Sequence, residues 1–196
     1  MNLSTYLLGI ILIIFLFQIT VADVTPLLIF VPSLAWVEPW RFISSIFLHG
    51  GVTHLFFNGY ALFLFGTILE NKVSKKDFLT IFFVSGIIGS LFYLGTIYTG
   101  ISPDIPALGA SGAIYGLLGA VAVFLPDLRI FFFFFPMRMR EAALLWVAIA
   151  FIGSFNSGSL IGHSAHLGGL LFGAVYAYYL KNKEHQVDPI YLAYYK

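Results

Sequence analysis

The sequence contains no cysteine and few charged residues. Of its 196 residues, ten are Lys or Arg and nine are Asp or Glu, so the charged fraction is only 10%. The absence of cysteine excludes disulfide bonds and catalysis by a thiolate. The net charge of +1 gives no case for binding to nucleic acid.

Apolar side chains take the place of the missing charge. Hydrophobic residues make up 60% of the chain, and the mean hydropathy is +0.94. A soluble domain of this length could not bury so much apolar surface. Because a bilayer-spanning helix needs about 20 apolar residues, roughly six spans fit within a single all-α membrane domain of residues 1–196. The expected spans are residues 3–22, 53–69, 78–98, 110–125, 141–156 and 160–180.

Three other segments need separate interpretations. The first span lacks a clear small-residue cleavage site, so we expect it to be retained, with removal as a signal peptide the lesser alternative. Residues 23–50 combine prolines with amphipathic tryptophans, which is typical of a loop embedded at the membrane surface. The apolar run Ile130–Phe135 is too short to cross, and we expect it to lie at the interface or to extend a neighbouring helix.

The basic residues predict the orientation. Only Arg41 follows the first expected span. The other nine follow the second, fourth or sixth span and are Lys72, Lys75, Lys76, Arg129, Arg138, Arg140, Lys181, Lys183 and Lys196. By the positive-inside rule, that group and both termini are cytosolic. Residues 182–196 then form a cytosolic tail. The short fifth span must also cross, since without it the last three lysines would lie on the opposite face.

Three polar residues fall at one expected depth. Asn58, Ser111 and His166 each precede the basic cluster that ends their span by about 14 to 18 residues, or roughly 20 to 27 Å at about 1.5 Å per residue. Intramembrane polar groups usually face a bundle interior or a wet cavity, so we expect one shared cavity toward the outer leaflet. The fourth and sixth spans also carry small-residue motifs that favour close helix contact: Gly112, Gly116, Gly169 and Gly173.

Contact between these two spans would make Ser111 and His166 neighbours. A serine hydroxyl becomes a good nucleophile when an adjacent base takes its proton, and histidine suits that role near neutral pH. The acids on the outer face all lie in loops, so a dyad is expected rather than a triad. Ser111 also begins a helix, where unpaired N–H groups can bind an oxyanion, and His54 and Asn58 share a helix face from which they could donate further hydrogen bonds.

Each residue taken singly also fits a structural role. Serine is common where membrane helices pack, and Asn58 could bond one helix to another. His166 could cap a helix, and Tyr115 could be a core residue. His49 and His163 are expected in solvated outer loops. The shared depth of the polar residues is what favours a catalytic site.

Four short motifs occur in a defined order along the chain. They are Trp40-Arg41, His49-x4-His54-x3-Asn58, Gly109-x-Ser111-Gly112 with Tyr115, and Ala165-His166-x-Gly168-Gly169. Over about residues 36–175, their order and spacing resemble the rhomboid family of intramembrane serine proteases. The resemblance implies a six-transmembrane-helix bundle with an embedded first loop and a water-accessible cavity open to the extracytosolic side.

The same resemblance implies roles for individual residues. Ser111 would be the nucleophile and His166 the general base. The oxyanion hole would be formed by His54, Asn58 and the Ser111 backbone N–H. Gly109 would border that site, and Tyr115 would stack on the catalytic histidine. Arg41 and Glu70 would be structural.

The substrates implied by the resemblance are membrane proteins with a single transmembrane helix, cut near the outer leaflet of the cell membrane. A regular helix hides its carbonyls in its own hydrogen bonds, so the substrate must unwind locally before Ser111 attacks. Water from outside would then hydrolyse the acyl-enzyme. The fifth span, with the loops that precede it, is the candidate mobile element for substrate entry, because its short apolar length indicates weak anchoring. We expect neither a cofactor nor a metal ion. Membrane lipid is an expected partner, and the sequence does not decide the oligomeric state.

Other functions fit the sequence less well. The segment Gly109–Ala113 fails the G-x-S-x-G pattern of soluble hydrolases. A metal site built from His49, His54, His163 and His166 lacks an acidic partner. A transporter would need a polar path that continues to the cytosolic face. A noncatalytic rhomboid-like scaffold that binds membrane segments would need a broken dyad, whereas both members are present.

Overall fold

The computed structural model describes residues 2–21, 23–132, 135–155 and 162–185. Six helices are long: α1 (Leu3–Thr20), α4 (Val52–Glu70), α5 (Lys75–Tyr98), α6 (Ser111–Phe124), α7 (Met139–Gly153) and α8 (His163–His185). Between α1 and α4 lie four short elements: α2 (Val24–Leu28), η1 (Pro32–Leu34), α3 (Arg41–Ser44) and η2 (Ser45–Phe47). Two antiparallel strands, β1 (Arg129–Phe132) and β2 (Phe135–Arg138), connect α6 with α7.

The strands correct one expectation. The run Ile130–Phe135 was expected to lie at the interface or to extend a helix, and helix extension is wrong, because Ile130 pairs with Met137 and Phe132 with Phe135 across a hairpin. Aromatic and β-branched residues fit a pleated ribbon well, and Pro136 is tolerated because a two-stranded ribbon has only edge strands. The described chain is therefore mostly helical rather than all-α.

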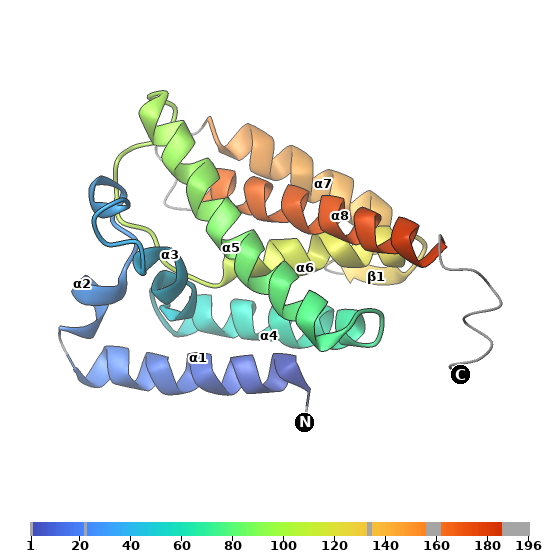
Figure 1. Ribbon diagram of the computed structural model, residues 1–196, viewed down its shortest axis with the longest axis horizontal. Helices are drawn as coiled ribbons and strands as arrows, with labels where there is room; N and C mark the ends of the chain where they lie inside the picture. The colour runs from blue at the N-terminus through green and yellow to red at the C-terminus, as the bar shows by residue number, and fades with distance from the viewer. Residues whose placement is uncertain (1, 22, 133–134, 156–161, 186–196) are drawn as a thin grey trace.

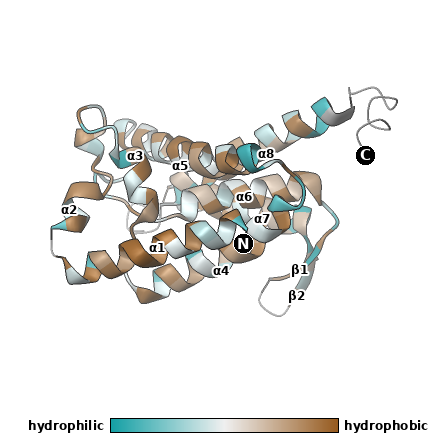
Figure 2. Ribbon diagram, turned by 60° about the horizontal axis from the view of Figure 1, so that its bottom comes forward, coloured by the Kyte–Doolittle hydropathy of each residue, from teal (hydrophilic) through white to brown (hydrophobic). Residues whose placement is uncertain are grey.

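The long helices coincide with the expected spans to within a few residues at most ends. Hydrophobic residues predominate along these helices (Figure 2). Large leucine, isoleucine or phenylalanine side chains are exposed on α1, α4 and α7. Within the described residues, α1, α4 and α5 are long and apolar enough to cross a membrane, and α6 is a shorter apolar helix. The chain is an integral membrane protein by this surface. The count of six crossings stays a prediction, and residues 156–161 and 186–196 of the expected spans and tail lie outside the described residues.

The helices lie side by side along the long axis of the molecule, with α5 crossing the others diagonally (Figure 1). The N-terminus, the turn between α4 and α5, the hairpin and the end of α8 gather at one end of the bundle, whereas α2 and α3 lie at the other. The described basic residues after α4 and α6, and those in the last turns of α8, therefore share one end. This is the arrangement that the orientation prediction requires, and the orientation itself stays a prediction.

The predicted contact between the fourth and sixth spans is confirmed. A Cβ atom added to Gly169 would lie 2.0 Å from the carbonyl oxygen of Gly112, and one added to Gly173 would lie 2.0 Å from that of Gly116. No side chain fits at such a distance. Glycine is therefore required for the backbones of α6 and α8 to approach this closely.

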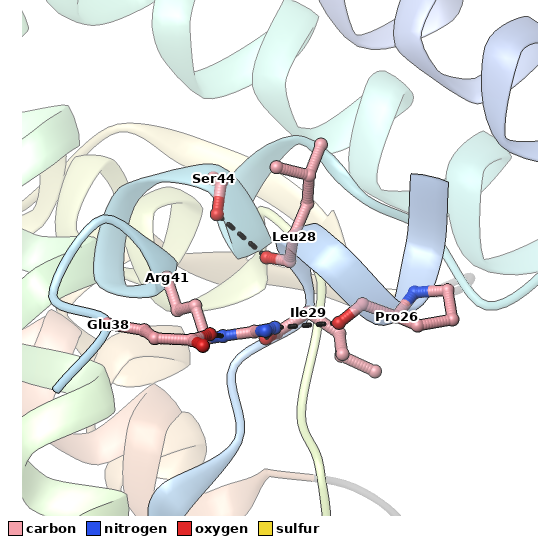
Figure 3. A network of polar contacts seen from close by, with 6 residues as sticks. All are labelled: Pro26, Leu28, Ile29, Glu38, Arg41 and Ser44. Carbon is pink, nitrogen blue, oxygen red and sulfur yellow. Dashed lines mark hydrogen bonds and ion pairs between the residues drawn. The ribbon is translucent and has the colours of Figure 1, made fainter. Parts of the chain in front are cut away.

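The segment between α1 and α4 is organised by Arg41, which is 5% exposed (Figure 3). Its guanidinium pairs with Glu38 and donates hydrogen bonds to the carbonyls of Pro26 at 2.8 Å and Ile29 at 2.7 Å. Ser44 Oγ donates to the last carbonyl of α2 at 2.7 Å. A buried guanidinium with these partners holds a loop that has little regular structure of its own.

Glu70, at the last position of α4, holds the beginning of α1. Its carboxylate accepts hydrogen bonds from the backbone N–H groups of Leu3 at 2.8 Å and Ser4 at 2.6 Å, and from the Ser4 hydroxyl. The first N–H groups of a helix have no partner within it, and a carboxylate there is also favoured by the helix dipole. Glu70 therefore joins two neighbouring helices, as a structural role would require.

Candidate active site

Ser111 is the first residue of α6, and the loop before it is held in an unusual conformation. Gly109 has a φ of 123°, in the region that favours glycine, and its N–H donates to the carbonyl of Ser45 at 2.9 Å. A Cβ atom on Gly109 would also lie 2.7 Å from His54 Cε1. Both backbone conformation and space therefore require glycine beside His54, two residues before Ser111.

His166 lies in the first turn of α8, opposite Ser111. Its Nε2 is 2.7 Å from Ser111 Oγ, which is hydrogen-bonding distance. The close backbone approach of α6 and α8 one turn further along brings these two side chains together. Tyr115, one turn after Ser111, stacks on the imidazole ring, with 4.2 Å between ring centroids and an interplanar angle of 8°. The ring of His166 is thus fixed in its plane and at its Nε2.

A cavity of about 410 Å³ opens beside Ser111. Its wall includes residues of the first loop, α5, the loop before α6 and the two ends of the connection between α7 and α8. Ser111, His54 and His163 are among the residues that line it, whereas His166 is not. The nucleophile candidate is therefore reachable from a space large enough for a short extended stretch of polypeptide.

The two predicted oxyanion-hole side chains lie in different settings. His54 lines the cavity next to Gly109. Asn58 is 6% exposed, donates to the backbone carbonyl of His54 at 3.0 Å, and is not among the residues lining the cavity. The structure thus brings His54 to the site, while a direct role for Asn58 stays a prediction.

His49 and His163 were both expected in solvated outer loops, and for His49 this is wrong. His49 is 2% exposed, and its ring packs edge-on against that of His54 with 5.2 Å between centroids. Burial, and to a lesser degree the neighbouring His54, lower the pKa of His49 to about 4, so its ring is neutral at physiological pH. His163 is half-buried at the start of α8 and packs against Gly153 at the end of α7.

Gln18 is a residue near the site that sequence reasoning missed. It lies near the end of α1 and makes two hydrogen bonds to the backbone of His49. A single amide in an otherwise apolar span is a signal that could have identified it, because polar side chains at such positions usually have a partner. Among the described residues, no group of three or more His, Asp or Glu side chains lies close enough to hold a metal ion.

Comparison with known proteins connects this site to a family. A family model described as "Rhomboid domain" matches residues 37–183. The chain is 35% identical over 153 residues to the rhomboid-type protein YdcA of Bacillus subtilis, an alignment that covers 76% of this chain and 71% of that one. It is also 36% identical over 137 residues to rhomboid protease GluP of the same organism, covering 69% of this chain and 25% of GluP.

A third relative comes from a mitochondrion. The chain is 35% identical over 143 residues to the human presenilin-associated rhomboid-like protein, mitochondrial, covering 70% of this chain and 37% of that protein. The chain therefore spans well under half the length of GluP and of the human protein. All the catalytic candidates lie within the residues matched by the family model.

Proposed function

Because this chain belongs to the rhomboid family, we propose that it is an intramembrane serine endopeptidase that cleaves transmembrane segments of membrane proteins with a Ser111–His166 dyad. The observation that carries this proposal is the 2.7 Å distance between His166 Nε2 and the Oγ atom of Ser111, which lines the cavity. A hydroxyl and an imidazole at this distance are the minimum needed for general-base activation.

Each group has a definite part in the proposed reaction. His166 Nε2 accepts the proton as Ser111 Oγ attacks the carbonyl carbon of the scissile bond, and it then returns the proton to the leaving amine. Water that enters the cavity repeats the sequence on the acyl-enzyme. Tyr115 keeps the imidazole ring in its plane through both steps by stacking on it.

The developing negative charge needs donors near Ser111. The backbone N–H of Ser111 lies in the first turn of α6, where N–H groups have no partner within the helix. His54, on the cavity wall beside Gly109, supplies a second donor. Asn58 contributes either directly, after a change of its side-chain rotamer, or by its bond to the His54 carbonyl.

The proposed substrates are proteins with a single transmembrane helix, which unwinds near the outer leaflet to expose its carbonyls. In the proposed orientation the nine clustered basic residues and both termini are cytosolic, and the cavity opens to the extracytosolic side. Gly153 and Ser154, at the end of α7, line the cavity, which makes that end of α7 the proposed place of substrate entry.

The test is cleavage of a purified single-span substrate in liposomes by the parent chain, Ser111→Ala and His166→Ala. Each substitution should lower the cleavage rate by about 10³-fold or more, because members of a catalytic unit fail together. Cleavage that persists in both variants would sink the proposal.

Covalent labelling by a fluorophosphonate tests the nucleophile directly. Ser111 should be labelled in the parent chain and not in His166→Ala. Ser154→Ala is the matched serine control, and Ser111 should still be labelled in it. Ser154 also lines the cavity, but its hydroxyl donates to the Ala150 carbonyl at 2.7 Å. A folded chain that neither cleaves nor labels would instead be a noncatalytic scaffold.

A further inference from the structure

Gln18 and the catalytic cavity are joined through the short loop before α4. Gln18 Nε2 donates to the carbonyl of His49 at 3.1 Å, and Gln18 Oε1 accepts from the His49 N–H at 2.8 Å. One side-chain amide therefore satisfies both backbone groups of one residue, as a neighbouring β-strand would. The end of α1 and the start of α4, which lie at the same end of the bundle in Figure 1, are fastened together by this pair.

The fastened loop contacts His54 in two places. The N–H of Gly50, the residue after His49, donates to His54 Nδ1 at 3.4 Å. The buried ring of His49 lies edge-on to the His54 ring, with 5.2 Å between centroids. A shift of residues 49 and 50 would therefore change both the hydrogen bond to His54 and the wall against which its ring packs.

The bond from Gly50 also selects a tautomer. Because His54 Nδ1 accepts a hydrogen bond from a backbone N–H, the hydrogen of the neutral ring must be on Nε2. Nε2 lies on the side of Gly109, where an added Cβ atom would be only 3.0 Å from it. An Nε2–H there is a donor beside Ser111, as an oxyanion hole needs, whereas the other tautomer would present a lone pair to the oxyanion.

We propose that Gln18 is a positioning residue for catalysis, which holds His49 and Gly50 so that His54 presents an Nε2–H to the oxyanion. This inference rests on the proposed function of His54 as an oxyanion donor. Gln18 itself touches neither substrate nor Ser111. Its effect passes through the loop, which explains why a polar amide lies near the end of a helix that is apolar along most of its length.

Gln18→Met is the decisive variant, because it keeps the length of the side chain and removes both hydrogen bonds to His49. Loss of a whole oxyanion donor costs about 10² to 10³ in kcat, so a misplaced donor should cost less, about ten-fold, with KM unchanged. Gln18→Glu, which keeps one acceptor for the His49 N–H, should give a smaller loss. Thr20→Val is the matched control on α1, because its hydroxyl bonds only to carbonyls of its own helix in the described residues.

A double-mutant cycle separates positioning from a merely structural role. In a His54→Ala background, Gln18→Met should cause no further fall in kcat, because the residue through which Gln18 acts is gone. An equal fall in both backgrounds, or no fall in the parent chain, would overturn the inference.

Ring ¹⁵N spectra of histidine-labelled protein give a readout independent of cleavage. The His54 signal, assigned by its loss in His54→Ala, should report a hydrogen on Nε2 in the parent chain and a mixture of tautomers in Gln18→Met. If the parent chain shows no Ser111-dependent cleavage, the proposed function fails, but these spectra still decide this inference. Identical His54 signals in the parent and in folded Gln18→Met would refute it.

Discussion

Helices α7 and α8 both reach the cavity, and they are held in different ways. α8 packs backbone against backbone, since Gly169 and Gly173 leave no room for a Cβ atom beside the carbonyls of α6. α7 buries mainly small side chains, of which Ala142 and Ala150 are examples, and exposes large ones to its surroundings. α8 carries the general-base candidate, whereas α7 forms part of the cavity wall. Under the proposed function, the catalytic pair would lie across the close contact of α6 with α8, and substrate would enter beside α7.

The largest expected effect is at the close contact of α6 with α8. Gly173→Ala places a methyl group 2.0 Å from the carbonyl oxygen of Gly116, and a backbone atom cannot move aside as a flexible side chain can. Overpacking against backbone should lower the free energy of unfolding by about 4 kcal/mol or more, or prevent folding. Thermal unfolding in detergent, followed by circular dichroism, measures the change.

Gly95→Ala in α5 is the matched control for this substitution. An added Cβ atom there meets nothing within 4 Å, and alanine favours a helix over glycine by about 1 kcal/mol, so stability should be unchanged or slightly higher. If the two variants unfold at the same temperature, the close contact of α6 and α8 is not what holds the bundle together.

A smaller effect is expected where α7 is anchored. Met139, its first residue, is fully buried, and its N–H donates to the carbonyl of Leu128 at 2.8 Å. Met139→Ala removes packing but keeps this backbone bond. Truncation in a water-soluble core costs about 2 to 5 kcal/mol, but lipid replaces part of the lost contact in a membrane, so about 1 to 2 kcal/mol is expected. Thermal unfolding in detergent measures the change. A loss of unfolding free energy as large as that of Gly173→Ala would remove the contrast between the two interfaces.

Sequence reasoning was most successful where one property repeats along a helix. Apolar length predicted the positions of the long helices, and glycines four residues apart predicted the contact of α6 with α8. That contact in turn predicted that Ser111 and His166 are neighbours. In the structure, Ser111 Oγ and His166 Nε2 are 2.7 Å apart. These features are local in sequence or depend on one helix pair.

What could not be predicted depends on contacts between distant residues. His49 is buried and its backbone bonds to Gln18, 31 positions earlier, and nothing in the segment 49–58 alone indicates either. The hairpin of β1 and β2 comes from a short aromatic run, which periodicity cannot assign to helix or strand. Arg41 could be expected to be structural by resemblance, but its carbonyl partners in Pro26 and Ile29 required the folded loop.

The smallest effect is expected on the outer surface of α7. Ile152 is 71% exposed near the end of α7, so in the proposed topology its side chain contacts lipid in the folded and the unfolded chain alike. Ile152→Ala should therefore change the free energy of unfolding by about 0.5 kcal/mol or less. Its effect on cleavage is the sharper measurement. If α7 moves at this end to admit substrate, a smaller lipid-facing side chain should change the rate for a membrane-embedded substrate while leaving fluorophosphonate labelling of Ser111 unchanged. A fall in both rates together would mean that Ile152 supports the catalytic pair itself, and α7 would then belong to the rigid part of the molecule with α6 and α8.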